Sequence, residues 1–186
     1  EETLEVEGDQ IFINTGSVSV IPPIKGIEGN PYVYTSDSLM ELDVLPKRLA
    51  IIGGGYIGLE YASMYTDFGA EVTVYQIEDK LIPREDRDIA EAIQKAFEDK
   101  GVHFEMNVQT EEIENAGSEA VVHYKKDGTA LTAGADAVLI ATGRKPNTEG
   151  LNLEAAGVEK TPRGAVKVDE KLRTSVPNIW AMGDVA

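Results

Sequence analysis

One stretch decides the fold of this chain: Leu49-Ala50-Ile51-Ile52-Gly53-Gly54-Gly55-Tyr56-Ile57-Gly58-Leu59-Glu60. It opens as an apolar, partly β-branched run, which is typical of a strand buried on both faces. A Gly-x-Gly-x-x-Gly turn follows, in which Gly53 permits the tight turn, Gly55 lets a phosphate approach the backbone, and Gly58 lets a helix pack close to the strand. The free N–H groups and the dipole of that helix would face the phosphates. The stretch therefore predicts a cradle for a diphosphate.

The residues after the turn complete a βαβ unit. Apolar side chains recur at helical spacing from Ile57 to Phe68, and Gly69 stands where a helix commonly ends. Residues 71–77 are rich in β-branched and aromatic side chains and predict the second strand. A Gly-x-Gly-x-x-Gly alone is a weak signal, because glycine-rich turns also occur for structural reasons. The order strand, turn, helix, strand makes dinucleotide binding the preferred interpretation.

Composition limits the remaining possibilities. The chain has 186 residues, 42% of them hydrophobic, which suits one good-sized core rather than two full domains. It has no cysteine, which excludes disulfides, cysteine-rich zinc sites and thiol nucleophiles. The net charge of −16 argues against a nucleic acid or an anionic membrane as partner. It does not argue against an anionic dinucleotide, because salt screens the exposed charges within ~8 Å and local amide donors can still bind the ligand. No apolar run approaches the roughly 18 residues of a membrane span, so we expect a soluble, cytoplasmic protein.

The rest of the chain carries shorter signals. His103 and His123 lack ligand spacing and are interpreted as structural, so no metal site is predicted. The further expected elements are a strand at 10–16, a short capped helix at 36–42, a helix at 87–100, a strand at 102–106, a hairpin at 120–131 turning at Asp127-Gly128, and a strand at 135–141.

Three separated motifs resemble one family, the two-dinucleotide flavoprotein reductases that include dihydrolipoamide dehydrogenase and glutathione reductase. Residues 51–60 resemble the family's nicotinamide fingerprint, residues 141–147 (ATGRKPN) the return to the FAD domain, and residues 174–184 (TSVPNIWAMGD) the second flavin motif. Thr15-Gly16 and residues 20–23 resemble the exit from the first FAD segment. The chain is thus identified as a member of the pyridine nucleotide-disulfide oxidoreductases.

This resemblance implies an α/β fold, with a Rossmann-like parallel sheet, a three-stranded β-meander crossover and short flanking remnants of an FAD domain. We expect an FAD-domain exit and connector at 1–43, the NAD(H)-binding domain at 44–147, and a truncated connector back to the FAD domain at 148–186. The family's N-terminal FAD fingerprint, its cysteine pair and its dimerisation domain are missing. The chain is therefore expected to be an inactive excised domain whose full-length parent is a homodimer. Residues 83–89 resemble a subgroup linked to resistance against reactive chlorine.

The resemblance also implies roles for single residues. Tyr56 would cover the nicotinamide pocket and swing aside, the alternative being helix packing. Glu60 would position the nicotinamide, or would be a solvated first-turn carboxylate. The Thr110 backbone would meet adenine, or Thr110 would only pack in a strand. The backbone of Gly143 would approach the nicotinamide, the alternative being that Gly143 only forms a turn at the end of a strand. Asp184 would hydrogen-bond the ribitol chain of FAD, and only in the full-length protein.

The choice of nicotinamide cofactor rests on three positions. An acidic residue about 20 positions beyond the glycines usually takes the ribose hydroxyls in NAD-specific proteins, and here that place holds Gln76, which can still hydrogen-bond a hydroxyl. Ile77 and Glu78 stand where glutathione reductase has its basic residues for the 2′-phosphate. A 2′-phosphate beside Glu78 would cost about 1 kcal/mol in water and up to ~4 kcal/mol in a partly desolvated site. NAD(H) is predicted over NADP(H), with FAD bound only by the full-length protein.

The predicted function is the NAD(H)-binding domain of an FAD-dependent oxidoreductase, which passes hydride from NADH to flavin and on to an unidentified acceptor. A short-chain dehydrogenase is disfavoured, because no tyrosine has a lysine four residues later. A stand-alone NAD-binding redox-sensing module remains the alternative. No catalytic residue is predicted in the chain. The predicted cofactor-binding residues are Gly53, Gly54, Gly55, Tyr56, Ile57, Gly58, Glu60, Gln76, Ile77, Glu78, Thr110, Gly143 and Asp184.

Overall fold

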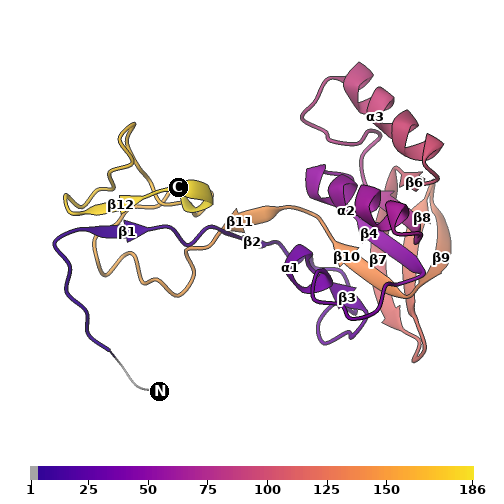
Figure 1. The fold of residues 1–186 in the computed structure, drawn as a ribbon, viewed down its shortest axis with the longest axis horizontal. Helices are drawn as coiled ribbons and strands as arrows, with labels where there is room; N and C mark the ends of the chain where they lie inside the picture. Colours follow the sequence, from indigo (N-terminus) through magenta and orange to yellow (C-terminus); the bar gives the residue numbers. More distant parts are fainter. Residues whose placement is uncertain (1–3) are drawn as a thin grey trace. The chain divides into compact units, whose positions relative to one another are not determined.

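The computed structural model describes residues 4–186 and divides the chain into two compact units (Figure 1). Residues 19–143 form one of them, here called the continuous unit. Residues 4–18 and 144–186 form the other, here called the two-segment unit. Residues 19–43, which the sequence suggested were a connector, belong to the continuous unit, while the proposed domain limits within a longer parent stay a prediction.

The continuous unit holds most of the regular structure. Its elements are β3 (Val33–Tyr34), α1 (Ser36–Leu39), β4 (Arg48–Ile52), α2 (Tyr56–Asp67), β5 (Glu71–Gln76), α3 (Arg87–Asp99), β6 (His103–Met106), β7 (Val108–Asn115), β8 (Ala120–Lys126), β9 (Thr129–Ala135) and β10 (Ala137–Ile140).

Five strands of this unit form a parallel sheet in the order β3-β10-β4-β5-β6. The register places Ile51 of β4 between Leu139 of β10 and Val74 of β5. Four of the five residues of β4 are buried, as the apolar run Leu49–Ile52 predicted. The expected α/β fold with a parallel sheet is confirmed.

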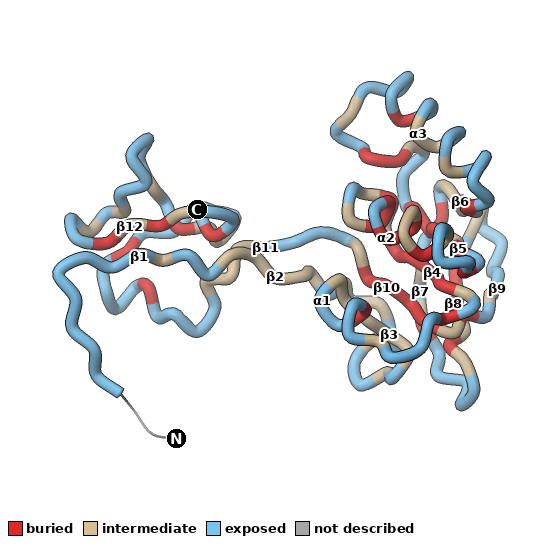
Figure 2. The backbone as a smooth tube through the Cα atoms, viewed as in Figure 1, coloured by how far each residue is buried: buried red, intermediate tan, exposed pale blue. Residues whose placement is uncertain are grey.

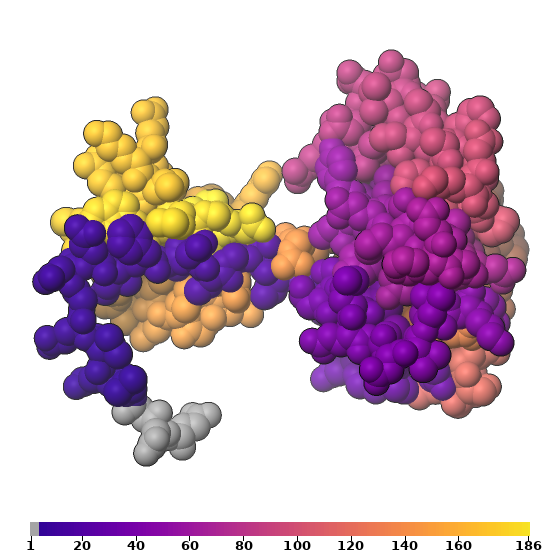
Figure 3. Space-filling view, viewed as in Figure 1, coloured from indigo at the N-terminus to yellow at the C-terminus, as the bar shows by residue number. Residues whose placement is uncertain are grey.

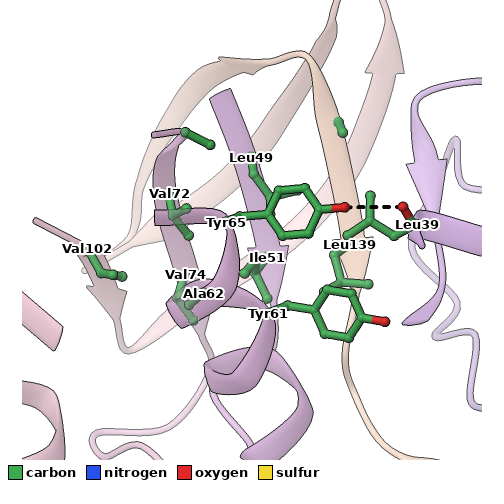
Figure 4. Close-up of a cluster of buried hydrophobic side chains, with 12 residues drawn as sticks. Leu39, Leu49, Ile51, Tyr61, Ala62, Tyr65, Val72, Val74, Val102 and Leu139 are labelled. Carbon is green, nitrogen blue, oxygen red and sulfur yellow. Dashed lines mark hydrogen bonds between the residues drawn. The ribbon is translucent and has the colours of Figure 1, made fainter. Parts of the chain in front are cut away.

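Alternation along β4 gives each face of the sheet its own core. Leu49 and Ile51 pack on the side of α2, whereas Ala50 and Ile52 pack against the β-meander. Figure 4 shows the α2 side, where Tyr65 donates a hydrogen bond of 3.1 Å from its hydroxyl to the carbonyl oxygen of Leu39. Figure 2 shows the buried backbone of this unit along the central strands. A two-sided core explains why an apolar run of only four residues, Leu49–Ile52, can anchor the fold.

The meander is the antiparallel sheet β7-β8-β9, which covers the second face. Its second hairpin turns at Asp127 and Gly128, both with positive φ (50° and 77°), as the sequence predicted. The resemblance implied a meander of three strands, but the bounds of β7 were not predicted, because only Val108 and Ile113 of its eight residues are buried and acidic side chains separate them. Its place in the sheet comes from pairing with β8.

The two-segment unit has a smaller core. Its elements are β1 (Ile11–Ile13), β2 (Ser17–Ser19, whose last residue falls in the continuous unit), β11 (Arg144–Pro146), β12 (Ile179–Ala181) and the 3-10 helix η1 (Gly183–Val185). Strands β1 and β12 pair in parallel, and the rings of Phe12 and Trp180 stack at 5.4 Å. Figure 3 shows the N-terminal and C-terminal segments, in indigo and yellow, lying side by side within this unit. In residues 4–186 no helix is long and apolar enough to cross a membrane.

Candidate functional site

A cavity of about 890 Å³ opens in the continuous unit at the carboxyl ends of the central strands. β4 ends there at Ile52, β5 at Gln76, and Ala141 follows β10. Because crevices at this edge of an open parallel sheet are the usual place for ligands, the cavity is the candidate site. Its lining residues are Pro22, Pro23, Ile24, Ile52, Gly53, Gly54, Gly55, Tyr56, Ile57, Tyr75, Gln76, Ile77, Glu78, Ile82, Pro83, Arg84, Val108, Gln109, Thr110, Ala141, Thr142 and Gly143.

The three fingerprint glycines differ in what surrounds them. Gly53 has φ +112°, and a Cβ there would come within 2.5 Å of the carbonyl oxygen of Ala141. A Cβ on Gly58 would come within 2.1 Å of the carbonyl oxygen of Gly53. A Cβ on Gly55 would meet no atom within 4 Å. Gly53 and Gly58 are thus required by the protein's own packing, whereas Gly55 leaves space that opens on the cavity.

Backbone donors face that space. Gly55 is the N-cap of α2 and, lacking a side chain, supplies no capping hydrogen bond. In residues 4–186 the N–H groups of Gly55, Tyr56 and Ile57 have no hydrogen-bond acceptor. Unsatisfied donors at a helix N-terminus are suited to bind an anion, and these three line one cavity wall.

Gln76 closes the back of the turn. It is a buried polar residue, 5% exposed, at the end of β5. Its Oε1 accepts a hydrogen bond of 2.9 Å from the N–H of Gly54, and its Nε2 donates one of 3.2 Å to the carbonyl oxygen of Lys80. Gly54 therefore supplies no free donor to the cavity. The second lone pair of the Gln76 Oε1 atom and the second hydrogen of its Nε2 atom are the parts of this side chain left for a ribose hydroxyl.

The opposite wall is the β5–α3 loop, residues 77–86. Its centre is tied to the glycine turn, because the N–H of Ile82 donates to the carbonyl oxygen of Gly54 at 2.8 Å and the Ile82 side chain is buried. Its start is tied to the meander side, because the N–H of Asn107 donates to the carbonyl oxygen of Glu78 at 3.2 Å. The loop is thus anchored at both ends of the cavity.

A side-chain contact joins the two walls. Tyr56 is 55% exposed, and its hydroxyl donates a hydrogen bond to the carboxylate of Glu85 in the β5–α3 loop. This bond raises the pKa of Tyr56, with burial and the charge of Glu85 acting in the same direction and the charge of Arg84 opposing them. Such exposure speaks against helix packing as the role of Tyr56.

Other predicted residues line the cavity as well. Ile77 and Glu78 are exposed on the loop wall, and Thr110 of β7 is half-buried beside them. Gly143 has φ +127°, and its carbonyl oxygen accepts a hydrogen bond of 2.9 Å from the N–H of Val20. Ten of the thirteen predicted residues therefore share one cavity: Gly53, Gly54, Gly55, Tyr56, Ile57, Gln76, Ile77, Glu78, Thr110 and Gly143.

Three predicted residues do not line it. Gly58 is buried behind the turn, and Glu60 is exposed on α2. Asp184 belongs to the two-segment unit, where its carboxylate accepts a hydrogen bond of 2.9 Å from the hydroxyl of Ser17. In the described part of the chain no group of three or more metal-ligating side chains forms a possible metal site.

Sequence reasoning missed about half of the lining. Pro22 and Pro23 were read only as part of a connecting motif, and Tyr75 only as a strand residue, yet all three line the cavity. Arg84 was also missed, although a basic side chain in the loop after the second strand of a βαβ unit could have indicated a residue of the site. The other positions come together only through the folding of distant segments.

Comparison with known proteins agrees with this geometry. The family described as "Pyridine nucleotide-disulphide oxidoreductase" matches residues 1–186. The chain is 46% identical over 185 residues to the probable pyridine nucleotide-disulfide oxidoreductase RclA of Escherichia coli, covering 100% of this chain and 41% of that protein. It is 40% identical over 190 residues to a mercuric reductase of Bacillus cereus, covering 100% of this chain and 30% of that protein.

A solved structure gives the same result. The Cu(II) complex of the HOCl-induced flavoprotein disulfide reductase RclA from Escherichia coli superposes with a TM-score of 0.90 at 46% identity, over 98% of this chain and 40% of that one. The chain thus spans less than half the length of these relatives. From the family match, the sequence identity and the fold, we conclude that this chain belongs to the pyridine nucleotide-disulfide oxidoreductase family, whose members are oxidoreductases.

Proposed function

We propose that the continuous unit binds NAD(H) in the cavity between the glycine turn and the β5–α3 loop. The observation that carries this proposal is the open wall at Gly55. The N–H groups of Gly55, Tyr56 and Ile57 are unpaired and face an open space. A Cβ added to Gly55 would meet no protein atom within 4 Å. A diphosphate fits there, since it offers several acceptor oxygens and negative charge to the N-terminus of α2.

We further propose that the unit works as part of an FAD-dependent oxidoreductase. FAD, when bound, supplies the group that takes up a hydride from NADH and passes electrons to an acceptor. The residues of this chain position the nucleotide: the turn holds the diphosphate, Gln76 meets a ribose hydroxyl, and Gly143 and Tyr56 border the space for the nicotinamide. Asp184 would hold the ribitol chain of FAD, as an exposed carboxylate beside the hydroxyl of Ser17.

NADH is the proposed cofactor over NADPH. The wall near Gln76 offers an apolar side chain, Ile77, and a carboxylate, Glu78, both exposed. A 2′-phosphate beside Glu78 would meet repulsion of about 1 to 4 kcal/mol, depending on solvation, which is about fivefold to several hundredfold in affinity. No observation favours the stand-alone sensing module over the flavoprotein.

Calorimetric titration of the purified chain tests the binding proposal, with ATP as a control for general phosphate affinity. We expect NADH to bind, NADPH to bind at least about fivefold more weakly, and ATP to bind more weakly than NADH. Absence of heat with NADH and NAD⁺ at millimolar concentration would refute nucleotide binding. Tighter binding of NADPH would refute only the cofactor preference.

The hydride step needs the flavin and so is tested on a protein that carries this chain together with its FAD-binding part. Anaerobic addition of NADH should bleach the flavin absorption in a stopped-flow experiment. A flavin that binds normally but is not reduced by NADH or NADPH would contradict the oxidoreductase proposal.

A further inference from the structure

The cavity contains one basic side chain. Among its lining residues only Glu78 and Arg84 are charged. This is notable in a chain with net charge −16, in which acidic residues outnumber basic ones 33 to 17. A guanidinium that lines a cavity of ligand size therefore calls for a chemical reason.

Arg84 also differs from the other arginines of the continuous unit in its lack of a partner. Arg48 pairs with Asp136 and Glu119, and Arg87 pairs with Asp79. Arg84 is exposed and has no hydrogen bond or ion pair with any residue in 4–186. Its five N–H donors are available to a ligand.

The loop anchors place Arg84 at one particular end of the cavity. The N–H of Ile82, two residues before Arg84, donates a hydrogen bond to the carbonyl oxygen of Gly54. The carboxylate of Glu85, the residue after Arg84, accepts a hydrogen bond from the hydroxyl of Tyr56. The backbone of Arg84 is thus fixed beside the glycine turn and the first residue of α2. Glu78, by contrast, is tied to Asn107 on the meander side. The two charged lining residues therefore sit toward different ends of the loop wall.

We propose that Arg84 is a binding residue for the diphosphate of the dinucleotide, reaching it from the loop wall opposite the free N–H groups of Gly55, Tyr56 and Ile57. This inference rests on the proposed function and adds a residue to that site. A guanidinium offers paired donors that match two phosphate oxygens, which a single amine does not. The glycine turn would then supply neutral donors and the β5–α3 loop the compensating charge.

The test compares R84Q, R84K and R163Q by calorimetry with NADH, NADPH and ADP-ribose, at low and high salt. Arg163, in the two-segment unit, is the matched control, because it is also an arginine without a partner in residues 4–186 and its change alters net charge equally. We expect R84Q to weaken all three ligands by a similar factor of about tenfold or more. R84K should lie between R84Q and wild type, R163Q should match wild type, and the salt dependence of binding should be shallower in R84Q.

Three results would overturn the inference. R84Q binding all three ligands like wild type would remove Arg84 from the site. Loss confined to NADPH would assign Arg84 to the 2′-phosphate instead. An equal loss of ligand affinity in R163Q would show that the effect of R84Q comes only from the change in net charge. These results differ from failure of the proposed function, in which wild-type protein itself binds neither NADH nor NAD⁺, and that result would remove both. Thermal unfolding of each variant identifies any loss that comes from misfolding.

Discussion

The two walls of the cavity are built on different principles. The glycine turn, residues 53–58, is held by backbone: Gly53 and Gly58 leave no room for a Cβ, and strands buried on both sides fix its position. The β5–α3 loop, residues 77–86, is held by a few hydrogen bonds and by buried Leu81 and Ile82. The turn therefore supplies a rigid geometry, whereas the loop supplies the charged side chains that line the cavity.

The largest expected effect comes from G53A. The new Cβ would stand 2.5 Å from the carbonyl oxygen of Ala141, on a residue with φ +112°. Strain and displacement together should lower the free energy of unfolding by about 2–4 kcal/mol and abolish nucleotide binding. Chemical denaturation and calorimetry measure the two effects. Wild-type stability in G53A would show that the turn is less rigid than described.

G55A breaks the function of the turn without breaking its structure. The added methyl group meets no protein atom within 4 Å, and the φ of −81° is ordinary for alanine. Stability should stay within about 1 kcal/mol of wild type, the cost of a poorer N-cap. NADH affinity should fall about a hundredfold, because the methyl group holds the diphosphate away from the N–H groups. A G55A protein that binds NADH normally would place the nucleotide elsewhere.

Q76L cuts the link between the two walls. It leaves the buried N–H of Gly54 without its acceptor at 2.9 Å and removes the bond to Lys80. We expect a loss of about 1–3 kcal/mol in the free energy of unfolding, measured by chemical denaturation. Q109L is the control, since Gln109 lines the same cavity but is exposed, and it should change stability by less than about 0.5 kcal/mol. Equal effects of the two changes would contradict the role given to Gln76.

The smallest effect concerns the loop contact to Tyr56. Because the Glu85 carboxylate accepts the tyrosine hydrogen, it favours the protonated form and raises the pKa of Tyr56 above 10.0. Any stability from this bond is therefore present below pH 10 and lost as the pH rises through the folded-state pKa. E85A should lower the pKa of Tyr56, seen by ultraviolet difference titration of tyrosinate, with Y56F identifying its signal. An unchanged titration in E85A would show that the two walls are not joined there.

The glycine turn could be predicted from the sequence to a greater extent than the β5–α3 loop. The turn could be predicted because local steric rules fix it: an apolar strand, glycines at set spacing and a helix leave one geometry, and the parallel sheet followed. Gln76 was predicted from its distance to the glycines, and Ile77 and Glu78 from the resemblance to glutathione reductase. The bond from Gln76 to Gly54 and the anchoring of Ile82 were not predictable, because they depend on how the loop folds back across 20 residues and more. Pro22 and Tyr75 were missed for the same reason, whereas the position of Arg84 in the loop after the second strand could have been noticed. The bounds of β7 were not predicted, because pairing rather than its own pattern makes it a strand.

The central claim is that the free amides of the glycine turn bind the diphosphate of a nicotinamide nucleotide. Titration of the ¹⁵N-labelled chain with NAD⁺, followed by two-dimensional NMR, tests it most directly. We predict that the amide resonances of Gly55, Tyr56 and Ile57 shift most and in proportion to occupancy. Shifts that leave these three amides unchanged while others move, or no shifts at millimolar NAD⁺, would contradict the account.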